Sequence, residues 1–209
     1  MSEPSPDPSA VIKLGGSLLD LPDLPVRLTN FLADFGRPHP IVLCGGGQSV
    51  DLIRKWDRLF NLGEEPSHWL ALQALTVNSQ VLAHAVPGLA YVTAISDFGR
   101  VWAAGETPVY DAYRFILDAD EQRSGSLPRR WRVTSDSIAA RAASHLNAAE
   151  VVLLKSVTLP PRVSFEEAAR EGWVDPHFPV VAREVERVTS VNFREDAPPE
   201  TVFFPEPST

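Results

Sequence analysis

The chain has 209 residues, 44% of them hydrophobic, which suits one domain with a single extended core and excludes two independent domains. Its formal net charge of -8 excludes a global attraction to nucleic acid or to an anionic membrane surface, so a small molecule is the expected partner. No apolar run approaches the roughly 20 residues that span a bilayer.

Two further features concern the cellular compartment. The chain has one cysteine, Cys44, so no intramolecular disulfide can form, and this favours a reducing compartment. Residues 1–9 are acidic and Pro-rich, whereas a signal peptide would be basic and then apolar. They predict a disordered tail on a cytoplasmic protein.

The first half of the chain alternates short apolar runs with helical periods. Residues 10–14 and 40–44 are predicted to be buried parallel strands, because each run is short, apolar and followed by glycines. The helical spacing of apolar residues and Ser67 as an N-cap predict helices over 24–35, 48–60 and 67–86. Further strands are expected over 89–95 and 101–103.

The second half begins after a polar stretch, 118–130, which contains Gly125 and Pro128 and predicts an internal loop or lid. The elements expected beyond it are a helix over 135–146, a strand over 150–155, a helix over 164–171 and strands over 185–193 and 202–204. This alternation predicts an α/β fold, a three-layer αβα sandwich with a mainly parallel sheet. One domain is expected over 10–204, with short tails at 1–9 and 205–209.

Two glycine clusters follow the first two strands. Gly15 and Gly16 precede Ser17, and Gly45, Gly46 and Gly47 form the second cluster. In parallel sheets ligands bind beyond the carboxyl ends of the strands, and glycines let backbone N–H groups approach phosphate oxygens closely. Either cluster alone is equally well explained as a tight turn between a strand and a helix. Together they predict an anion site.

Two lysines end apolar runs, Lys13 after the first strand residues and Lys155 after 151–154. A buried ammonium group needs an anion or water, so Lys13 is predicted to neutralise a transferring phosphoryl group, and Lys155 repeats the arrangement. Asp136 lies in the first turn of a helix that Thr134 or Ser135 caps, and we expect it to hold the lysines by ion pairs. The alternatives are strand-end lysines that reach solvent and a carboxylate that only stabilises its helix.

A resident metal is not expected. Asp175 and His177 are the nearest to a metal-binding pair, and the other histidines lack paired spacing with cysteine or carboxylates.

Three blocks carry a resemblance to a known family: Val11-Ile12-Lys13-Leu14-Gly15-Gly16-Ser17, Ile41-Val42-Leu43-Cys44-Gly45-Gly46-Gly47 and Thr134-Ser135-Asp136-Ser137-Ile138-Ala139. With these three blocks in this order, the sequence resembles the amino acid kinase superfamily. The resemblance implies an acceptor-binding part over about 10–118 and a nucleotide-binding part over about 131–204. It also implies ATP over the carboxyl ends of the later strands and the acceptor near the second glycine cluster.

The same resemblance implies roles for single residues. Lys13, Asp136 and Lys155 would be catalytic, with Lys155 also on the nucleotide. Gly15, Gly16 and Ser17 would cradle the ATP phosphates, and the acceptor would bind at Gly45, Gly46, Gly47 and Ser135. One departure is that Lys155-Ser156-Val157-Thr158-Leu159-Pro160-Pro161 replaces the family pattern Thr-Asp-x-Asp-Gly-Val-Tyr.

A narrower resemblance lies in residues 131–140 and 171–176, which are similar to a small subgroup linked to methanofuran-type cofactor biosynthesis. It implies phosphorylation of an aminomethyl-furan methyl phosphate, whose amine would pair with a carboxylate such as Asp97 or Asp111.

The sequence as a whole predicts a homo-oligomeric, ATP-dependent kinase of a small phosphate acceptor, with Mg²⁺ held mainly by the nucleotide. The alternatives are a kinase of an amino-acid carboxylate and a non-catalytic nucleotide- or anion-binding protein on the same fold.

Overall fold

The computed structural model describes residues 6–196 and 199–206. These residues form a sheet of eight strands in the order β3-β4-β2-β1-β5-β7-β8-β6, and every pair of neighbours is parallel except β7 and β8. The strands are β1 (Ala10–Leu14), β2 (Ile41–Cys44), β3 (Leu89–Val92), β4 (Thr107–Tyr110), β5 (Glu150–Lys155), β6 (Arg162–Ser164), β7 (Arg187–Asn192) and β8 (Thr201–Phe204).

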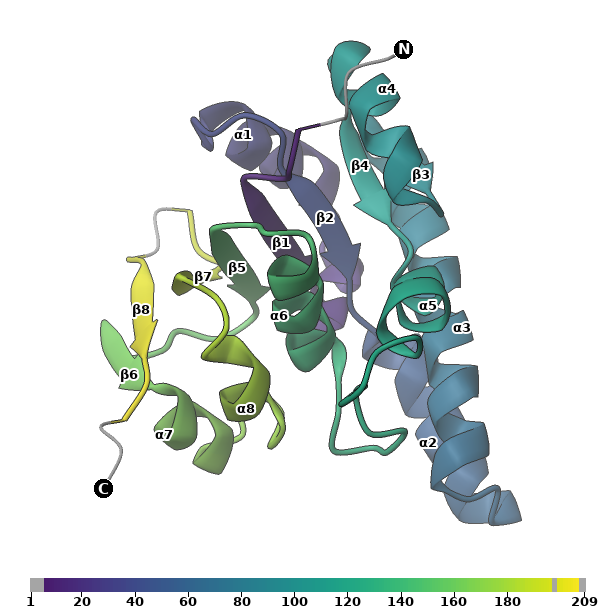
Figure 1. Ribbon diagram of the computed structural model, residues 1–209. Helices are drawn as coiled ribbons and strands as arrows, with labels where there is room; N and C mark the ends of the chain where they lie inside the picture. The colour runs from purple at the N-terminus through teal and green to yellow at the C-terminus, as the bar shows by residue number, and fades with distance from the viewer. Residues whose placement is uncertain (1–5, 197–198, 207–209) are drawn as a thin grey trace.

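Helices cover both faces of this sheet, and a separate hydrophobic core lies on each face. In Figure 1, α6 lies in front of β1 and β5, and α1 lies behind them. The α-helices are α1 (Leu24–Asp34), α2 (Gly47–Phe60), α3 (Glu64–Ala85), α4 (Phe98–Ala103), α5 (Ala112–Phe115), α6 (Ser135–His145), α7 (Phe165–Arg170) and α8 (Phe178–Ala182). Two short 3₁₀ helices cover Gly16–Asp20 and Ile95–Asp97, and a π-helical turn covers Ile116–Asp120. The predicted αβα sandwich with a mainly parallel sheet is confirmed.

The alternation of side chains along β1 and β5 decides where their lysines point. Val11 of β1 and Val151 of β5 belong to the core on the α6 face, together with residues of α6 itself. Successive side chains of a strand point to opposite faces, so Lys13 and Lys155, two and four residues further on, point to the α6 face as well. Because β1 and β5 are neighbours, both lysines reach the same edge of the sheet.

The predicted strand over 101–103 is wrong. Val101 is fully buried, but it lies in α4, which runs up to Ala103, and the strand β4 begins four residues later at Thr107. A three-residue apolar run cannot distinguish a buried helix turn from a strand, and here Gly105, with φ +76°, makes the turn between the two elements. The preceding strand also ends early, at Val92.

The long helix α3 begins before the predicted N-cap. Gly63 is its N-cap, and Ser67 lies fully buried inside the first turns. Glu64 and Glu65 occupy the first turn, where acidic side chains interact favourably with the helix dipole, and this stabilises the earlier start.

Parts of the predicted tails are ordered against the domain. Residues 1–5 and 207–209 lie outside the described residues. Pro8 is buried, and the N–H of Ser9 donates to the carbonyl oxygen of His39 at 3.2 Å. The carboxylate of Glu206 accepts from the Ser164 hydroxyl at 2.8 Å. The described ends of the chain are therefore attached to the domain, while its division into two binding parts stays a prediction.

Among residues 6–196 and 199–206, none of the helices combines the length and apolar character that a membrane span requires. Three apolar side chains of α3, Leu70, Val77 and Val81, are exposed. They are the kind of surface on which the predicted homo-oligomer depends, and that oligomer stays a prediction.

Candidate active site

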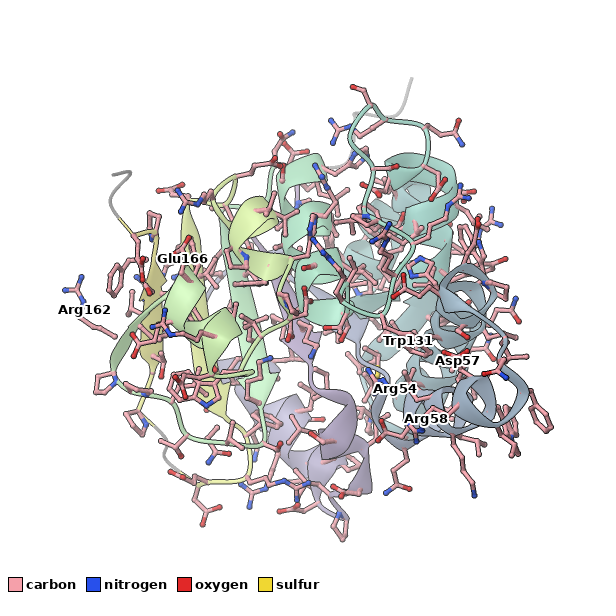
Figure 2. The ribbon with its side chains drawn as sticks, turned by 90° about the horizontal axis from the view of Figure 1, so that it is seen from below. Arg54, Asp57, Arg58, Trp131, Arg162 and Glu166 are labelled. Atoms are coloured by element: carbon pink, nitrogen blue, oxygen red, sulfur yellow. The ribbon has the colours of Figure 1, made fainter. Side chains whose placement is uncertain are left out.

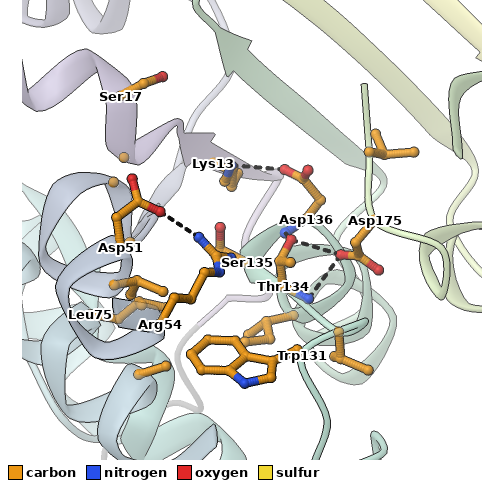
Figure 3. Close-up of a pocket in the computed structure, with 18 of the residues that line it drawn as sticks. Lys13, Ser17, Asp51, Arg54, Leu75, Trp131, Thr134, Ser135, Asp136 and Asp175 are labelled. Carbon is orange, nitrogen blue, oxygen red and sulfur yellow. Dashed lines mark hydrogen bonds and ion pairs between the residues drawn. The ribbon is translucent and has the colours of Figure 1, made fainter. Parts of the chain in front are cut away.

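A cavity of about 590 Å³ lies beyond the carboxyl ends of β1 and β5. Its walls come from both glycine turns, α2, α3, the first turn of α6 and the loops before α6 and α8. Parallel strands with helices around them leave such a crevice at their carboxyl ends. Figure 3 shows side chains of these elements pointing into one space.

Three buried charged groups meet at the base of this cavity. The Nζ of Lys13 lies 2.8 Å from Oδ1 of Asp136, and the Nζ of Lys155 lies 2.6 Å from Oδ2. The exposed fractions of these residues are 5% for Lys13, 5% for Asp136 and 9% for Lys155. The ion pairs predicted from the sequence are present, and the strand-end lysines do not reach bulk solvent.

The electrostatics of this triad leave a net positive charge. Burial alone would raise the pKa of Asp136, but the ammonium groups of Lys13 and Lys155 outweigh burial and lower it to about 2. Burial and repulsion from Lys13 lower the pKa of Lys155, while Asp136 and Asp175 raise it. Two ammonium groups share one carboxylate, so one positive charge remains to attract an anion.

The two glycine turns touch each other. A Cβ on Gly16 would overlap the backbone N of Gly47, and a Cβ on Gly47 would overlap the carbonyl of Gly16. Gly47 also has φ +52°, in the left-handed region. Glycine is therefore required here for the close approach of two backbones, which places Gly16, Ser17, Gly46 and Gly47 together in the cavity wall.

The first glycine of each cluster, Gly15 or Gly45, is part of the sheet's hydrogen bonding and not of the cavity wall. The N–H of Gly15 donates to the carbonyl of Leu154 at 2.9 Å, and the N–H of Gly45 donates to that of Leu14 at 2.8 Å. Neither residue lines the cavity among the described residues. Their backbone N–H groups thus extend the sheet, and the predicted roles of Gly15 at the ATP phosphates and of Gly45 at the acceptor stay predictions.

A side chain of α3 orients the second turn. The amide nitrogen of Asn78 donates to the carbonyls of Gly45 and Gly46, at 2.8 Å in each case. The hydroxyl of Ser49 donates to the same Gly46 carbonyl at 2.6 Å. These contacts turn both carbonyls toward Asn78 of α3 and fix the conformation of the second turn.

The remaining predicted residues lie at the base of α6. Ser135 is the first helical residue and lines the cavity, and Thr134 is the N-cap. The hydroxyl of Ser17 donates to that of Ser156 at 3.0 Å, which joins the first glycine turn to the segment after β5. The predicted site residues other than Gly15 and Gly45 are thus together around one cavity, and their roles stay predictions.

One wall of the cavity is formed by residues of α2 and by Trp131. The Arg54 guanidinium lies 5.1 Å from the centre of the Trp131 ring and donates to Asp51 at 2.6 Å. The indole N–H of Trp131 donates to Asp57 at 2.7 Å. Figure 2 shows Arg54, Asp57 and Trp131 gathered on one side of the molecule, far from Glu166 and Arg162. We call this wall the Arg54–Trp131 wall.

Other predicted partners lie elsewhere. Asp111 is buried against Thr76 and Tyr91 and caps α5, and neither Asp111 nor Asp97 lines the cavity among the described residues. They cannot pair with an amine of a molecule bound there, so this expectation is wrong. In the described part of the chain there is no group of three or more His, Cys, Asp or Glu side chains that could hold a metal ion.

Sequence reasoning missed Arg54, His68 and Asn78. The signal for Asn78 is a polar residue between Leu75 and Leu82, on the buried stripe of a helix, where an amide needs a partner. His68 also lies on this helix, and burial lowers its pKa, so it is neutral at pH 7. Nothing in the local pattern distinguishes Arg54 from other charged residues of α2.

These observations define a class of protein. A mainly parallel sheet whose strand ends carry a buried Lys–Asp–Lys triad beside two glycine turns defines an α/β protein with a positively charged cavity at the ends of its strands. Residues 9–158 match the amino acid kinase family, and the chain belongs to this family. The match covers the triad and both turns and ends before β6, α7, α8, β7 and β8.

One curated relative shares a low sequence identity with this chain. The chain is 26% identical over 148 residues to a [5-(aminomethyl)furan-3-yl]methyl phosphate kinase from Methanocaldococcus jannaschii, and the match covers 70% of this chain and 65% of that protein. The chain thus spans less than two thirds of the length of this curated relative.

Solved structures share the fold. Uridylate kinase from Archaeoglobus fulgidus superposes with a TM-score of 0.62 at 16% identity, over 94% of this chain and all of that one. Aspartate kinase from Synechocystis gives a TM-score of 0.63 at 14% identity, over 96% of this chain and 41% of that one.

Proposed function

We propose that the protein is an ATP-dependent kinase that transfers the γ-phosphoryl group to a phosphate oxygen of a small molecule. The observation that carries the proposal is the buried triad of Lys13, Asp136 and Lys155 at the base of the cavity. Phosphoryl transfer depends mainly on positioning and on stabilising charge over the transferred group. A rigid pair of ammonium groups supplies both.

Each lysine has a distinct part in this proposal. Asp136 fixes both ammonium groups, so neither has to reorganise when charge develops on the transferred group. Lys13, between the two turns, would contact the phosphoryl group in transfer, and Lys155, beside Ser156, would contact the nucleotide phosphates. The net positive charge of the triad would stabilise the negative charge of the transition state.

The carboxylates of the cavity favour a phosphate acceptor. Among the described residues they are Asp51, Asp136 and Asp175. Asp136 is occupied by two ammonium groups, and Asp175 accepts hydrogen bonds on both oxygens. Asp51 accepts from Arg54 at 2.6 Å, so each of the three carboxylates already has a partner. A phosphate acceptor, which is already deprotonated at neutral pH, needs no general base.

The donor set of the cavity fits the phosphates of ATP, with two ammonium groups, the Ser17 hydroxyl and a helix N-terminus at Gly47. It offers no free pair of carboxylates, so Mg²⁺ would be held by the nucleotide. When bound with the nucleotide, the ion would supply positive charge that neutralises part of the phosphate charge.

The Arg54–Trp131 wall supports a specific acceptor. The relative from Methanocaldococcus jannaschii is named for a substrate that combines a flat furan ring, a primary amine and a phosphate. The Trp131 ring and the apolar side chains of Leu72 and Leu75 line the space that a flat ring would occupy. Asp51 is the carboxylate in reach of an amine there, and Arg54 is a cation for an acceptor phosphate. We propose an aminomethyl-furan methyl phosphate as the acceptor.

The test is ADP formation from ATP and Mg²⁺ with a panel of acceptors, alongside ATP binding by calorimetry. The panel contains the aminomethyl-furan phosphate, simple phosphomonoesters, uridylate, aspartate and glutamate derivatives. Turnover with a phosphomonoester supports the proposal, and turnover only with aspartate or a glutamate derivative identifies a carboxylate kinase. ATP binding without turnover on any acceptor identifies a non-catalytic binder.

A lysine variant tests the triad. We expect Lys13→Ala to lower kcat by at least about 10²-fold, because it removes a charge that stabilises the transition state. The matched control is Lys55→Ala, which removes the third lysine of the chain, an exposed residue of α2. Unchanged turnover in Lys13→Ala would reject the assignment.

A further inference from the structure

Asp175 is the most extensively hydrogen-bonded carboxylate of the cavity. It lies in the loop between α7 and α8 and is 6% exposed. Its Oδ2 accepts from the N–H of Thr134 at 3.0 Å, from the Thr134 hydroxyl at 2.9 Å and from the N–H of Ser137 at 3.0 Å. Its Oδ1 accepts from the Ser137 hydroxyl at 2.5 Å and from the N–H groups of His177 and Phe178 at 3.0 and 3.1 Å.

These six donors are all neutral, and within residues 6–196 and 199–206 no cation pairs with Asp175. A buried carboxylate costs several kcal/mol unless hydrogen bonds compensate it, and three donors on each oxygen provide that compensation. Each oxygen already accepts three hydrogen bonds. The arrangement therefore serves to hold backbone and hydroxyl groups in place, and Figure 3 shows Asp175 beside Thr134.

The donors belong to the N-termini of two helices. Thr134 is the N-cap of α6, and Ser137 lies in the first turn of that helix. His177 is the N-cap of α8, and Phe178 is its first residue. The local cap of α6 is weak, because the Thr134 hydroxyl is 3.5 Å from the N–H of Asp136. Asp175 supplies the strong cap from a distant part of the chain.

The hydrogen bonds of Asp175 hold Thr134 before Asp136 and Ser137 after it. We propose that Asp175 is a positioning residue that holds Asp136 between the two lysines of the triad by fixing the first turn of α6. Two anchored neighbours leave the Asp136 backbone no freedom to rotate away from the lysines. The kinetic part of the proposal rests on the proposed phosphoryl transfer, whereas the geometric part does not.

The charge of Asp175 gives the proposal a distinctive readout. The charged groups that act on Lys155 are Asp136, Lys13 and Asp175, and Asp175 raises the pKa of Lys155. Replacing it by a neutral group of the same size lowers that pKa. The alkaline limb that deprotonation of Lys155 would produce in the pH profile of kcat should then move to lower pH. Loss of folding stability alone would not move this limb.

The test variant is Asp175→Asn, whose amide nitrogen cannot accept the hydrogen bonds of one carboxylate oxygen. We expect kcat to fall roughly 10²-fold, because small displacements of a catalytic group have effects of that size. The titration of the lysines is followed by NMR of labelled side chains, which is practical because the chain has three lysines and the exposed Lys55 serves as a reference. We expect the Lys155 titration to move to lower pH.

The matched control is Asp111→Asn. Asp111 is also a buried capping carboxylate, with Thr76, Tyr91 and the N–H of Arg114 as donors, but it lies outside the cavity. We expect Asp111→Asn to lower the stability of the fold and to keep the wild-type kcat and the wild-type titration of Lys155. If Asp175→Asn keeps both properties as well, or if the control changes them equally, the proposal is wrong.

Two further outcomes separate the proposal from the proposed function. Unchanged kcat in Asp175→Asn, with turnover in the wild type, would reject the positioning role and leave the kinase in place, whereas a wild type without turnover on any acceptor would reject the kinase. If Asp175→Asn does not fold, Thr134→Val replaces it, since this variant removes one donor and keeps the charge. It should lower kcat and leave the Lys155 titration unchanged, and a wild-type kcat would overturn the positioning role.

Discussion

Trp131 joins the loop before α6 to helix α2 by two contacts of its side chain. Arg54 of α2 stacks on the ring, and Asp57, one turn further along the helix, accepts from the indole N–H at 2.7 Å. The hydrogen bond to Trp131 is the largest influence on Asp57 and lowers the pKa of its carboxyl group. A ring held on both its face and its edge keeps a fixed orientation in the cavity wall.

The fixed orientation of the Trp131 ring leads to a prediction about acceptor binding. Trp131→Phe keeps a flat ring and loses the hydrogen bond to Asp57 that fixes the orientation of the ring. We expect the KM for the acceptor to rise by about tenfold or more and the KM for ATP to stay unchanged, as measured by steady-state kinetics.

The matched control is Trp102→Phe, which removes an indole hydrogen bond to the carbonyl of Pro40, outside the cavity. Equal changes in the two KM values, or an acceptor KM that rises as much in Trp102→Phe, would mean that the Trp131 ring does not contact the acceptor.

At the residue scale, the triad was predictable and the Arg54–Trp131 wall was not. Each lysine ends an apolar strand, and a buried ammonium group needs an anion or water. Asp136, in the first turn of the predicted helix over 135–146, offered a carboxylate that could hold both lysines by ion pairs. Arg54 and Asp57 carry no such constraint, because charged residues on a helix surface are ordinary. Their importance arises from contacts with Trp131, which lies more than 70 residues further along the chain and which no local pattern specifies.

At the element scale, the contact of the two glycine turns fixes how β1 and β2 lead into their helices. Gly16 begins a 3₁₀ helix, Gly47 begins α2, and their backbones meet without side chains between them. This contact holds the N-terminus of α2 over the carboxyl end of β1. The cavity therefore depends on two glycines that need not touch a ligand themselves.

We expect Gly16→Ala to destabilise the fold by about 3 kcal/mol or more, because a Cβ there meets backbone on the other turn, which cannot move aside as a side chain can. Urea denaturation would measure this. The control is Gly88→Ala, where φ is +82° and no atom lies within 4 Å of the added Cβ, so only the backbone conformation is strained. A loss in Gly16→Ala no larger than in the control would contradict the close approach.

The sheet illustrates what a sequence can predict of its elements. The strands β1, β2 and β5 are built around apolar runs and are buried on both faces, with Lys13 as the charged residue of β1 and Glu150 and Lys155 at the two ends of β5. The expectation of parallel strands is confirmed for all three. The strand β4 contains Pro108 and a threonine, and the apolar residues of the preceding helix α4 offered a better but wrong candidate. The edge strand β6 has three residues, too few for any periodicity.

At the scale of the whole molecule, the acidic chain concentrates positive charge in one buried place. The formal net charge is -8, and two of the three lysines lie in the triad. An anionic ligand is therefore attracted by the local field of the cavity and not by the surface as a whole. This arrangement also makes the stability of the fold depend on the protonation of Asp136.

The sign of that dependence follows from the pKa of Asp136, which is lowered from 3.8 to about 2 in the folded protein. A carboxyl group whose pKa is lowered on folding stabilises the fold above its unfolded pKa, and this contribution disappears as pH falls through the folded pKa. The difference corresponds to about 2 kcal/mol. We expect this part of the unfolding free energy to be lost between about pH 4 and about pH 2.

The measurement is the unfolding free energy from urea titrations over this pH range, in the wild type and in Asp136→Asn. The variant should be less stable at neutral pH, because it leaves two buried ammonium groups without a counterion, and its stability should fall less steeply in acid. Asp34→Asn, at the exposed end of α1, should retain the wild-type slope. If wild type and Asp136→Asn lose stability in parallel below pH 4, the triad does not stabilise the fold through an ionised Asp136, and the lysines must be held by other contacts.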